Sequence, residues 1–213
     1  VFVIFLLIAI IDQFFGLHPV YRLIIQITLV FISLSTIHFP ITEFLPLKLE
    51  YLLVLYFWVY IINTTNFIDG TDGMMSVTNL NLYFNILLFS FLTNKYSVAY
   101  EISILLIPIS LIFLIFFNFP KAKMFIGDTG SIPIGFINGF LLFSLISNGE
   151  LILAFAIFSY PIIDVTITLF IKTIIKRELP WSRLYDYFFL KPVIHNGKTH
   201  LYVLRFNIFN SLI

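Results

Sequence analysis

The 213-residue sequence contains no cysteine, and only 11% of its residues are charged. The absence of cysteine excludes disulfide bonds from this chain. A net charge of +1 gives no indication of nucleic-acid binding, and we expect none. The sequence is instead rich in apolar residues, with 27 phenylalanines and a mean hydropathy of +1.04. A soluble domain of this size does not need so much apolar surface.

The apolar residues form continuous runs, several of which approach the roughly 17–25 residues that cross a bilayer as a helix. We predict an all-α fold, a polytopic transmembrane helix bundle of about eight spans forming one integral membrane domain over residues 1–213. The predicted spans are residues 1–11, 22–37, 51–62, 74–92, 102–119, 132–147, 151–171 and 200–213. Because the first and last runs are cut short, we expect the chain to belong to a longer protein.

Charge is distributed unequally between the two sides of this predicted bundle. If each run crosses once, nine Lys or Arg residues fall on one side and two on the other. The basic side is the cytoplasmic side by the positive-inside rule. All six aspartates also lie on or near that side, which membrane insertion alone does not require.

The first polar stretch is NFIDGTDG, residues 66–73. An aspartate at membrane depth costs about 2.5–3.5 kcal/mol, so it usually faces a partner, a cation or water. If Asp69 and Asp72 lie on a helical turn, their spacing places both carboxylates on one face, where a cation would relieve their repulsion. Hard oxygen ligands favour Mg²⁺, with Mn²⁺ as the alternative ion. An ordinary helix cap explains the same residues about equally well.

The second polar stretch is NFPKAKMFIGDTGS, residues 118–131. Lys121 and Lys123 could hold phosphates, and Asp128 lies between two glycines just before the next predicted helix. Such a turn exposes backbone N–H groups and hydroxyls, which suits a phosphate. It is not a Walker loop, because no Lys-Ser/Thr pair follows the glycines. A plain capped turn is the alternative.

Both stretches resemble signatures of one family. NTTNFIDGTDG is similar to the Asn-x-x-Asn-x-x-Asp-Gly-x-Asp-Gly signature of the polyprenyl-phosphate N-acetylhexosamine-1-phosphate transferases, glycosyltransferase family 4. FNFPKAKMFIGDTGSIPIGF resembles their second signature, and YPIIDVTITLFIKTIIKRE resembles their Pro-x-x-Asp helix. The family includes the enzyme that makes lipid I and those that start teichoic acid, enterobacterial common antigen and O-antigen synthesis. The resemblance covers essentially the whole chain.

The resemblance implies a Mg²⁺-dependent enzyme of the bacterial inner membrane, with a cytoplasmic active site. The expected reaction joins a UDP-sugar to polyprenyl phosphate, such as undecaprenyl phosphate, and releases UMP. The expected partners are these two substrates and the bilayer, and a homodimer is left open. The implied catalytic residues are Asp12, Asp69 and Asp72, the metal ligands Asp128 and Asn66, and the substrate-binding residues Asn63, Asn118, Lys121, Lys123, Arg183 and His200.

Two departures from the family pattern stand out. The family's Asp-Asp pair is Asp12-Gln13 here, and Gln13 can form hydrogen bonds but carries no charge. The loss need not abolish catalysis, because a phosphate monoester, with a second pKa near ~6, is mostly dianionic at pH 7. The expected His-rich final loop has no clear counterpart, with His195 and His200 as candidates.

The missing His-rich loop favours a surface-glycan initiator that uses a UDP-N-acetylhexosamine or a deoxy derivative. Two alternatives remain open at this point. One is an inactive relative that acts as a membrane assembly partner, which Gln13 keeps open. The other is a cation-coupled transporter whose inner acids bind the ion.

Overall fold

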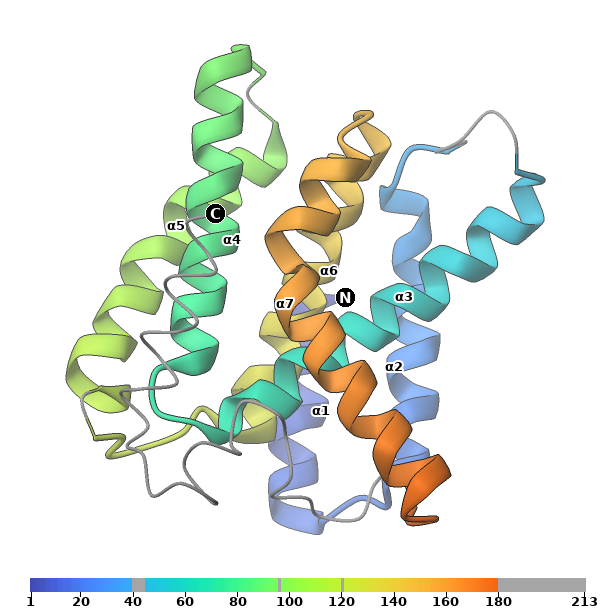
Figure 1. Cartoon of the computed structure of the whole chain (residues 1–213), viewed down its shortest axis with the longest axis vertical. Coiled ribbons are helices and arrows are strands. Elements are labelled where there is room, and N and C mark those ends of the chain that lie inside the picture. Colours follow the sequence, from blue (N-terminus) through green and yellow to red (C-terminus); the bar gives the residue numbers. More distant parts are fainter. Residues whose placement is uncertain (40–44, 96, 120, 180–213) are drawn as a thin grey trace. The chain divides into compact units, whose positions relative to one another are not determined.

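The computed structural model describes residues 1–39, 45–95, 97–119 and 121–179, and within them every regular element is helical (Figure 1). This confirms the predicted all-α fold. The helices are α1 (Phe2–Phe15), α2 (Pro19–Ser33), α3 (Leu47–Phe67), α4 (Met74–Thr93), α5 (Val98–Phe113), α6 (Gly127–Ser147) and α7 (Leu151–Phe170).

Six of these helical segments, all but the shorter apolar α1, are long and apolar enough to cross a membrane. The chain is therefore a multi-pass membrane protein, and seven of the eight predicted apolar runs are helices. The eighth run, residues 200–213, lies outside the described residues, as do Arg183, His195 and His200.

The described residues form two compact units. Unit 1 comprises Val1–Asn66 and Ile126–Ala156, and it holds α1, α2, α6, nearly all of α3 and the start of α7. Within the described residues, unit 2 comprises 67–95, 97–119, 121–125 and 157–179, and it holds α4, α5 and the rest of α7. The single domain expected from the sequence stays a prediction.

In unit 1, α1 packs along α6, and α3 approaches α6 through two glycines. The indole of Trp58 on α3 is fully buried, stacks on Phe136 at 5.3 Å between ring centroids, and donates a 2.9 Å hydrogen bond from Nε1 to the Phe136 carbonyl. Gly139 lies directly against this indole, and Gly135 lies against the Ile62 backbone. Small residues at helix contacts let membrane helices approach closely.

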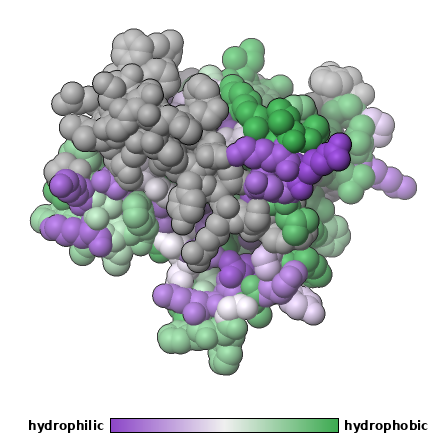
Figure 2. Space-filling model, turned by 60° about the horizontal axis from the view of Figure 1, so that its bottom comes forward, coloured by the Kyte–Doolittle hydropathy of each residue, from purple (hydrophilic) through white to green (hydrophobic). Residues whose placement is uncertain are grey.

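In unit 2, α4 packs against α5, and α5 continues into a short π-helix, η3 (Leu114–Asn118). Only 11% of the α5–η3 span is buried, so most of its apolar side chains are free to face lipid. Large apolar side chains are also exposed on other helices, and hydrophobic surface reaches the face seen in Figure 2. Exposed apolar surface on this scale is typical of a protein solvated by a bilayer.

Helix ends differ from the prediction at the polar stretches. Helix α3 continues through Asn63 and Asn66, which were expected in a connection, and α6 already begins at Gly127, so Asp128 lies in its first turn. Asp69 and Asp72 do not share a helical turn. The 3₁₀ segment η2 (Ile68–Gly70) holds Asp69, and the extended backbone of Thr71 then separates it from Asp72. The condition under which both carboxylates would share one helical face is therefore not met.

Candidate active site

The C-terminal end of α1 holds the Asp12 carboxylate in a fixed position. Gly16 takes the left-handed conformation (φ 63°), and its N–H donates a 2.7 Å bond to the Asp12 carbonyl. The chain turns back so that the Leu17 N–H donates to Asp12 Oδ1 at 2.7 Å. Asp12 is buried, and a carboxylate near the negative end of a helix needs such donors.

Arg22 on α2 joins two acids of unit 1. Its Nε lies 2.8 Å from Asp12 Oδ2, and its Nη1 donates to Oδ2 of Asp128 in the first turn of α6. A third bond runs from Nε to the Leu17 carbonyl at 3.1 Å. A guanidinium suits this task because its planar set of donors can serve several acceptors in fixed directions.

Asn66, near the end of α3, holds the other oxygen of Asp128. Its Nδ2 donates to Asp128 Oδ1 at 2.7 Å and to Ser131 Oγ at 2.8 Å. Both amide hydrogens are thereby used, so the Asn66 Oδ1 is the atom left to accept a hydrogen bond or bind a cation. The side chain of Asp128 is 45% exposed, which leaves it accessible to a ligand.

Gln13 also has a specific contact in unit 1. The Thr129 hydroxyl donates a 2.7 Å hydrogen bond to Gln13 Oε1, linking the end of α1 to the first turn of α6. Gln13 thus holds the residue next to Asp128 without adding a negative charge. Among the described residues, this site has two carboxylates, Asp12 and Asp128, and one guanidinium, that of Arg22.

In unit 2, Asn118 joins the two polar loops. Its Oδ1 accepts the Gly73 N–H at 2.6 Å, and its Nδ2 donates to the Met124 carbonyl at 3.1 Å. Asn118, the last residue of η3, is 1% exposed, whereas Lys121 and Lys123 in the loop that follows are exposed. The Asn118 amide therefore links Gly73, which follows Asp72, to the loop that contains Lys121 and Lys123, called the lysine loop below.

Comparison with known proteins identifies the chain. The sequence model of glycosyl transferase family 4 matches residues 1–147, which include every residue of the unit 1 site. The chain belongs to this family. The resemblance predicted from the two signatures is thereby confirmed.

Two relatives show how much of a family 4 protein is present. A phospho-N-acetylmuramoyl-pentapeptide-transferase of Nautilia profundicola is 26% identical over 195 residues, covering 82% of this chain and 55% of the relative. One of the same name from Staphylococcus aureus is 32% identical over 126 residues, covering 57% of this chain and 37% of the relative. The chain thus spans about half or less of the length of these relatives.

The predicted site residues of this family 4 chain divide between the units. Unit 1 brings together Asp12, Asn66 and Asp128, and unit 2 holds Asp69, Asp72, Asn118, Lys121 and Lys123. Asn63 lies in unit 1, but its amide nitrogen is bonded to Gln26 and to the Val59 carbonyl. Sequence reasoning counted Arg22 only as a positive charge and missed its bridging role. Its position at the start of the next helix, ten residues after Asp12, was the available signal.

The residues around Asp128 include oxygen donors that suit a magnesium ion. Within the described residues, no three His, Cys, Asp or Glu side chains form a group that could hold a metal. Mg²⁺ does not require such a group, because it commonly keeps several waters and takes one or two carboxylates together with substrate phosphates. The exposed Asp128 carboxylate and the Asn66 Oδ1 are hard oxygen donors of this kind, so the pair fits.

Proposed function

We propose that this protein transfers a sugar-1-phosphate from a UDP-sugar to polyprenyl phosphate, releasing UMP and starting the synthesis of a cell-surface glycan. The observation that supports this most is the Arg22 bridge between Asp12 and Asp128. It gathers the acids of two motif segments beside Asn66 in a family 4 chain. The relatives' name, which is that of a phospho-sugar transferase, supports the same class of reaction.

In the proposed reaction, an oxygen of the lipid phosphate attacks the phosphorus that carries the sugar. A new P–O bond forms, the bond to the bridging oxygen breaks, and UMP leaves with the electron pair. The lipid phosphate is mostly dianionic at pH 7, since its second pKa is near ~6, so a general base contributes less than usual. Asp12 would orient this phosphate or accept a residual proton.

Two anions must approach each other in this reaction, so cationic groups have to offset their charge. Arg22 is the described cation of the unit 1 site and can grip a phosphate through two N–H groups. Asp128 and Asn66 would hold Mg²⁺, with Mn²⁺ as the alternative ion, and a bound ion would neutralise charge on the diphosphate. Asn66 also fixes the direction of the Asp128 carboxylate.

The proposed setting is the bacterial inner membrane, with the site on the cytoplasmic side. The excess of Lys and Arg on one side of the predicted bundle supports this orientation. For the donor we propose a UDP-N-acetylhexosamine or a deoxy derivative. The relatives' name points to an N-acetylmuramoyl-pentapeptide donor for those proteins, so that nucleotide sugar belongs among those tested.

The decisive experiment measures UMP release by the purified full-length protein with undecaprenyl phosphate, Mg²⁺ and a panel of UDP-sugars. Lipid-dependent UMP from one sugar would support the proposal and identify the donor. Asp128→Asn should then lose turnover while the protein still inserts into membranes normally. If no sugar yields UMP while an active family member works alongside, the result would contradict the proposal and favour the inactive relative, the alternative that Gln13 keeps open.

A further inference from the structure

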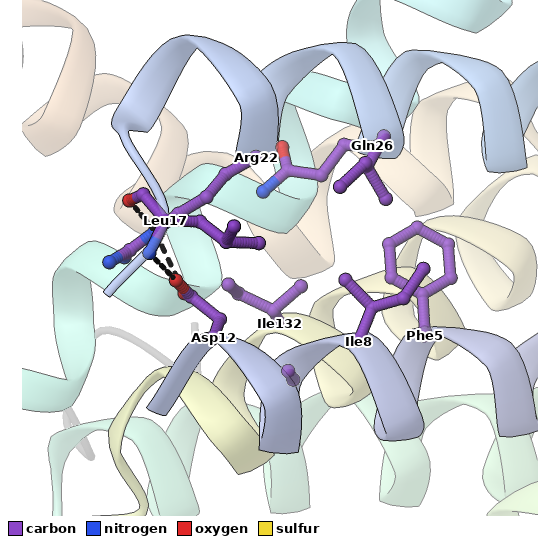
Figure 3. Close-up of a pocket in the computed structure, with 9 residues that line it drawn as sticks. Phe5, Ile8, Asp12, Leu17, Arg22, Gln26 and Ile132 are labelled. Carbon is purple, nitrogen blue, oxygen red and sulfur yellow. Dashed lines mark hydrogen bonds and ion pairs between the residues drawn. The ribbon is translucent and has the colours of Figure 1, made fainter. Parts of the chain in front are cut away.

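Gln26 on α2 is a buried polar side chain beside the site that neither the signatures nor the proposed reaction uses. It is 4% exposed, and it lines a small pocket in unit 1 together with Asp12 and Arg22 (Figure 3). The rest of the lining is mainly apolar and includes Phe5, Ile8 and Ile132. A buried amide in such surroundings is costly unless its hydrogen-bonding groups find partners.

The orientation of the Gln26 amide follows from its neighbours. Asn63 Nδ2 lies 2.8 Å from the Val59 carbonyl, which can only accept, so that atom must be the nitrogen. The same nitrogen lies 2.8 Å from Gln26 Oε1, which must therefore be the oxygen. The Nε2 atom of Gln26 therefore faces the pocket, and Figure 3 shows it on the side of Arg22.

Within the part of the chain that the structure describes, Gln26 Nε2 makes no hydrogen bond. Asp12 does not need it, because Leu17 and Arg22 already serve the two Asp12 oxygens. The pocket has a volume of about 20 Å³, enough for one water-sized oxygen and too small for a lipid chain. Gln26 therefore presents a buried donor to a space that fits a single acceptor atom.

The neighbouring charge indicates which acceptor this is. A neutral donor next to the Arg22 guanidinium favours an anionic oxygen, since both groups can donate to it. The charge of Asp12, which also lines the pocket, is already paired with Arg22. We propose that Gln26 donates a hydrogen bond to a phosphate oxygen of the acceptor lipid, with Arg22 as the adjacent cation and Asn63 as the residue that sets the amide's direction. The proposal rests on the proposed function, because it names a contact to one of its two substrates.

The test compares binding of undecaprenyl phosphate with that of undecaprenol, which lacks the phosphate, to the purified full-length protein in detergent. Gln26→Leu should weaken binding of the phosphate lipid about tenfold or more, since a hydrogen bond to a charged group is lost, and leave undecaprenol binding unchanged. In turnover assays, the KM for the lipid should rise while the KM for the UDP-sugar stays constant. Gln26→Asn, which withdraws the amide by one methylene, serves if the leucine variant does not fold.

Asn63 provides an independent arm of the test. If it acts by orienting Gln26, Asn63→Leu should weaken phosphate-lipid binding in the native background and have little further effect in the Gln26→Leu background. Asn85→Leu is the matched control, because Asn85 is a half-buried amide on α4 bonded to Asn81. That variant should bind both lipids as the native protein does.

Unchanged discrimination between the two lipids in Gln26→Leu, with only a lower thermal stability, would mean that the pocket holds a structural water and would overturn the proposal. A fall in UDP-sugar binding in place of lipid binding would overturn it too. Failure of the proposed reaction looks different. The native protein would then bind undecaprenyl phosphate through Gln26 but release no UMP with any sugar.

Discussion

The Arg22 guanidinium lies 2.8 Å from the Asp12 carboxylate, and the same guanidinium binds Asp128 on α6. One cation thus fixes two acids that come from different helices of unit 1. Removing it would leave a buried carboxylate without its cation, which is strongly destabilising for that site.

Replacing Arg22 by Met is expected to lower turnover about 100-fold or more, because a loss of about 2.7 kcal/mol in transition-state stabilisation has that effect. Arg22→Lys should recover part of the activity, since an ammonium keeps the charge but lacks the planar set of donors. Lys48→Met is the control, because Lys48 is an exposed cation outside the site. Near-native UMP release by Arg22→Met would contradict the bridge's role.

The Gln13–Thr129 contact predicts how an added charge would act. Gln13→Glu keeps an oxygen that can accept the Thr129 hydroxyl and adds one negative charge near Asp128. Mn²⁺ binding to the substrate-free protein, measured by electron paramagnetic resonance, should tighten about fivefold, the equivalent of about 1 kcal/mol. Gln13→Leu, which removes the contact without adding charge, should not tighten it. Equal Mn²⁺ affinity in all three proteins would argue against a metal beside Asp128.

Gly139 is predicted to tolerate no side chain. A Cβ at this position would lie 2.1 Å from Trp58 Cδ1, so Gly139→Ala forces the buried indole or α6 to move. Overpacking of this kind costs about 1–3 kcal/mol, which should appear as a lower melting temperature in detergent. Gly70→Ala is the matched control, because nothing lies within 4 Å of a Cβ built there. An equal melting temperature for the two variants would refute the packing argument.

Asn118 is predicted to order the lysine loop of unit 2. In Asn118→Leu, amide hydrogen exchange at residues 117–125 should speed up, since the bond from Nδ2 to the Met124 carbonyl is lost. Asn118→Asp keeps an acceptor for the Gly73 N–H. Amide exchange near Gly73 should therefore be slower in Asn118→Asp than in Asn118→Leu. Unchanged exchange together with weaker UDP-sugar binding would instead support the direct substrate contact expected from the sequence.

The helices were predictable because a membrane span requires a continuous apolar run, and seven such runs fall in the described residues as helices. The positions at which α3 ends and α6 begins, in the polar stretches, were not predictable. Asn63, Asn66 and Asp128 have low helix propensity, but differences of a few tenths of a kcal/mol are smaller than the hydrogen bonds these side chains make. Asn66 remains helical while its amide binds Asp128 and Ser131.

The acidic residues of the candidate site were predictable from the sequence, but the Arg22 bridge between them was not. Asp12, Asn66 and Asp128 stand out because such residues are rare in an apolar chain, and the family signatures contain them. Arg22 stands out only as a charge, since its contact with Asp128 joins residues that are 106 positions apart. No local pattern specifies such a pairing, and the same holds for the amide contact between Asn63 and Gln26.

The α1–α2 corner also has a consequence for how the protein is made. Asp12, Leu17 and Arg22 contact one another within a single helical hairpin, so their bonds can form as soon as that hairpin is inserted. The codon for Asp128 is read 106 residues after that for Arg22, about 5 to 20 s later at ordinary rates of synthesis. We expect the Arg22 charge to be paired with Asp12 during that interval, and α6 to complete the bridge once it is inserted.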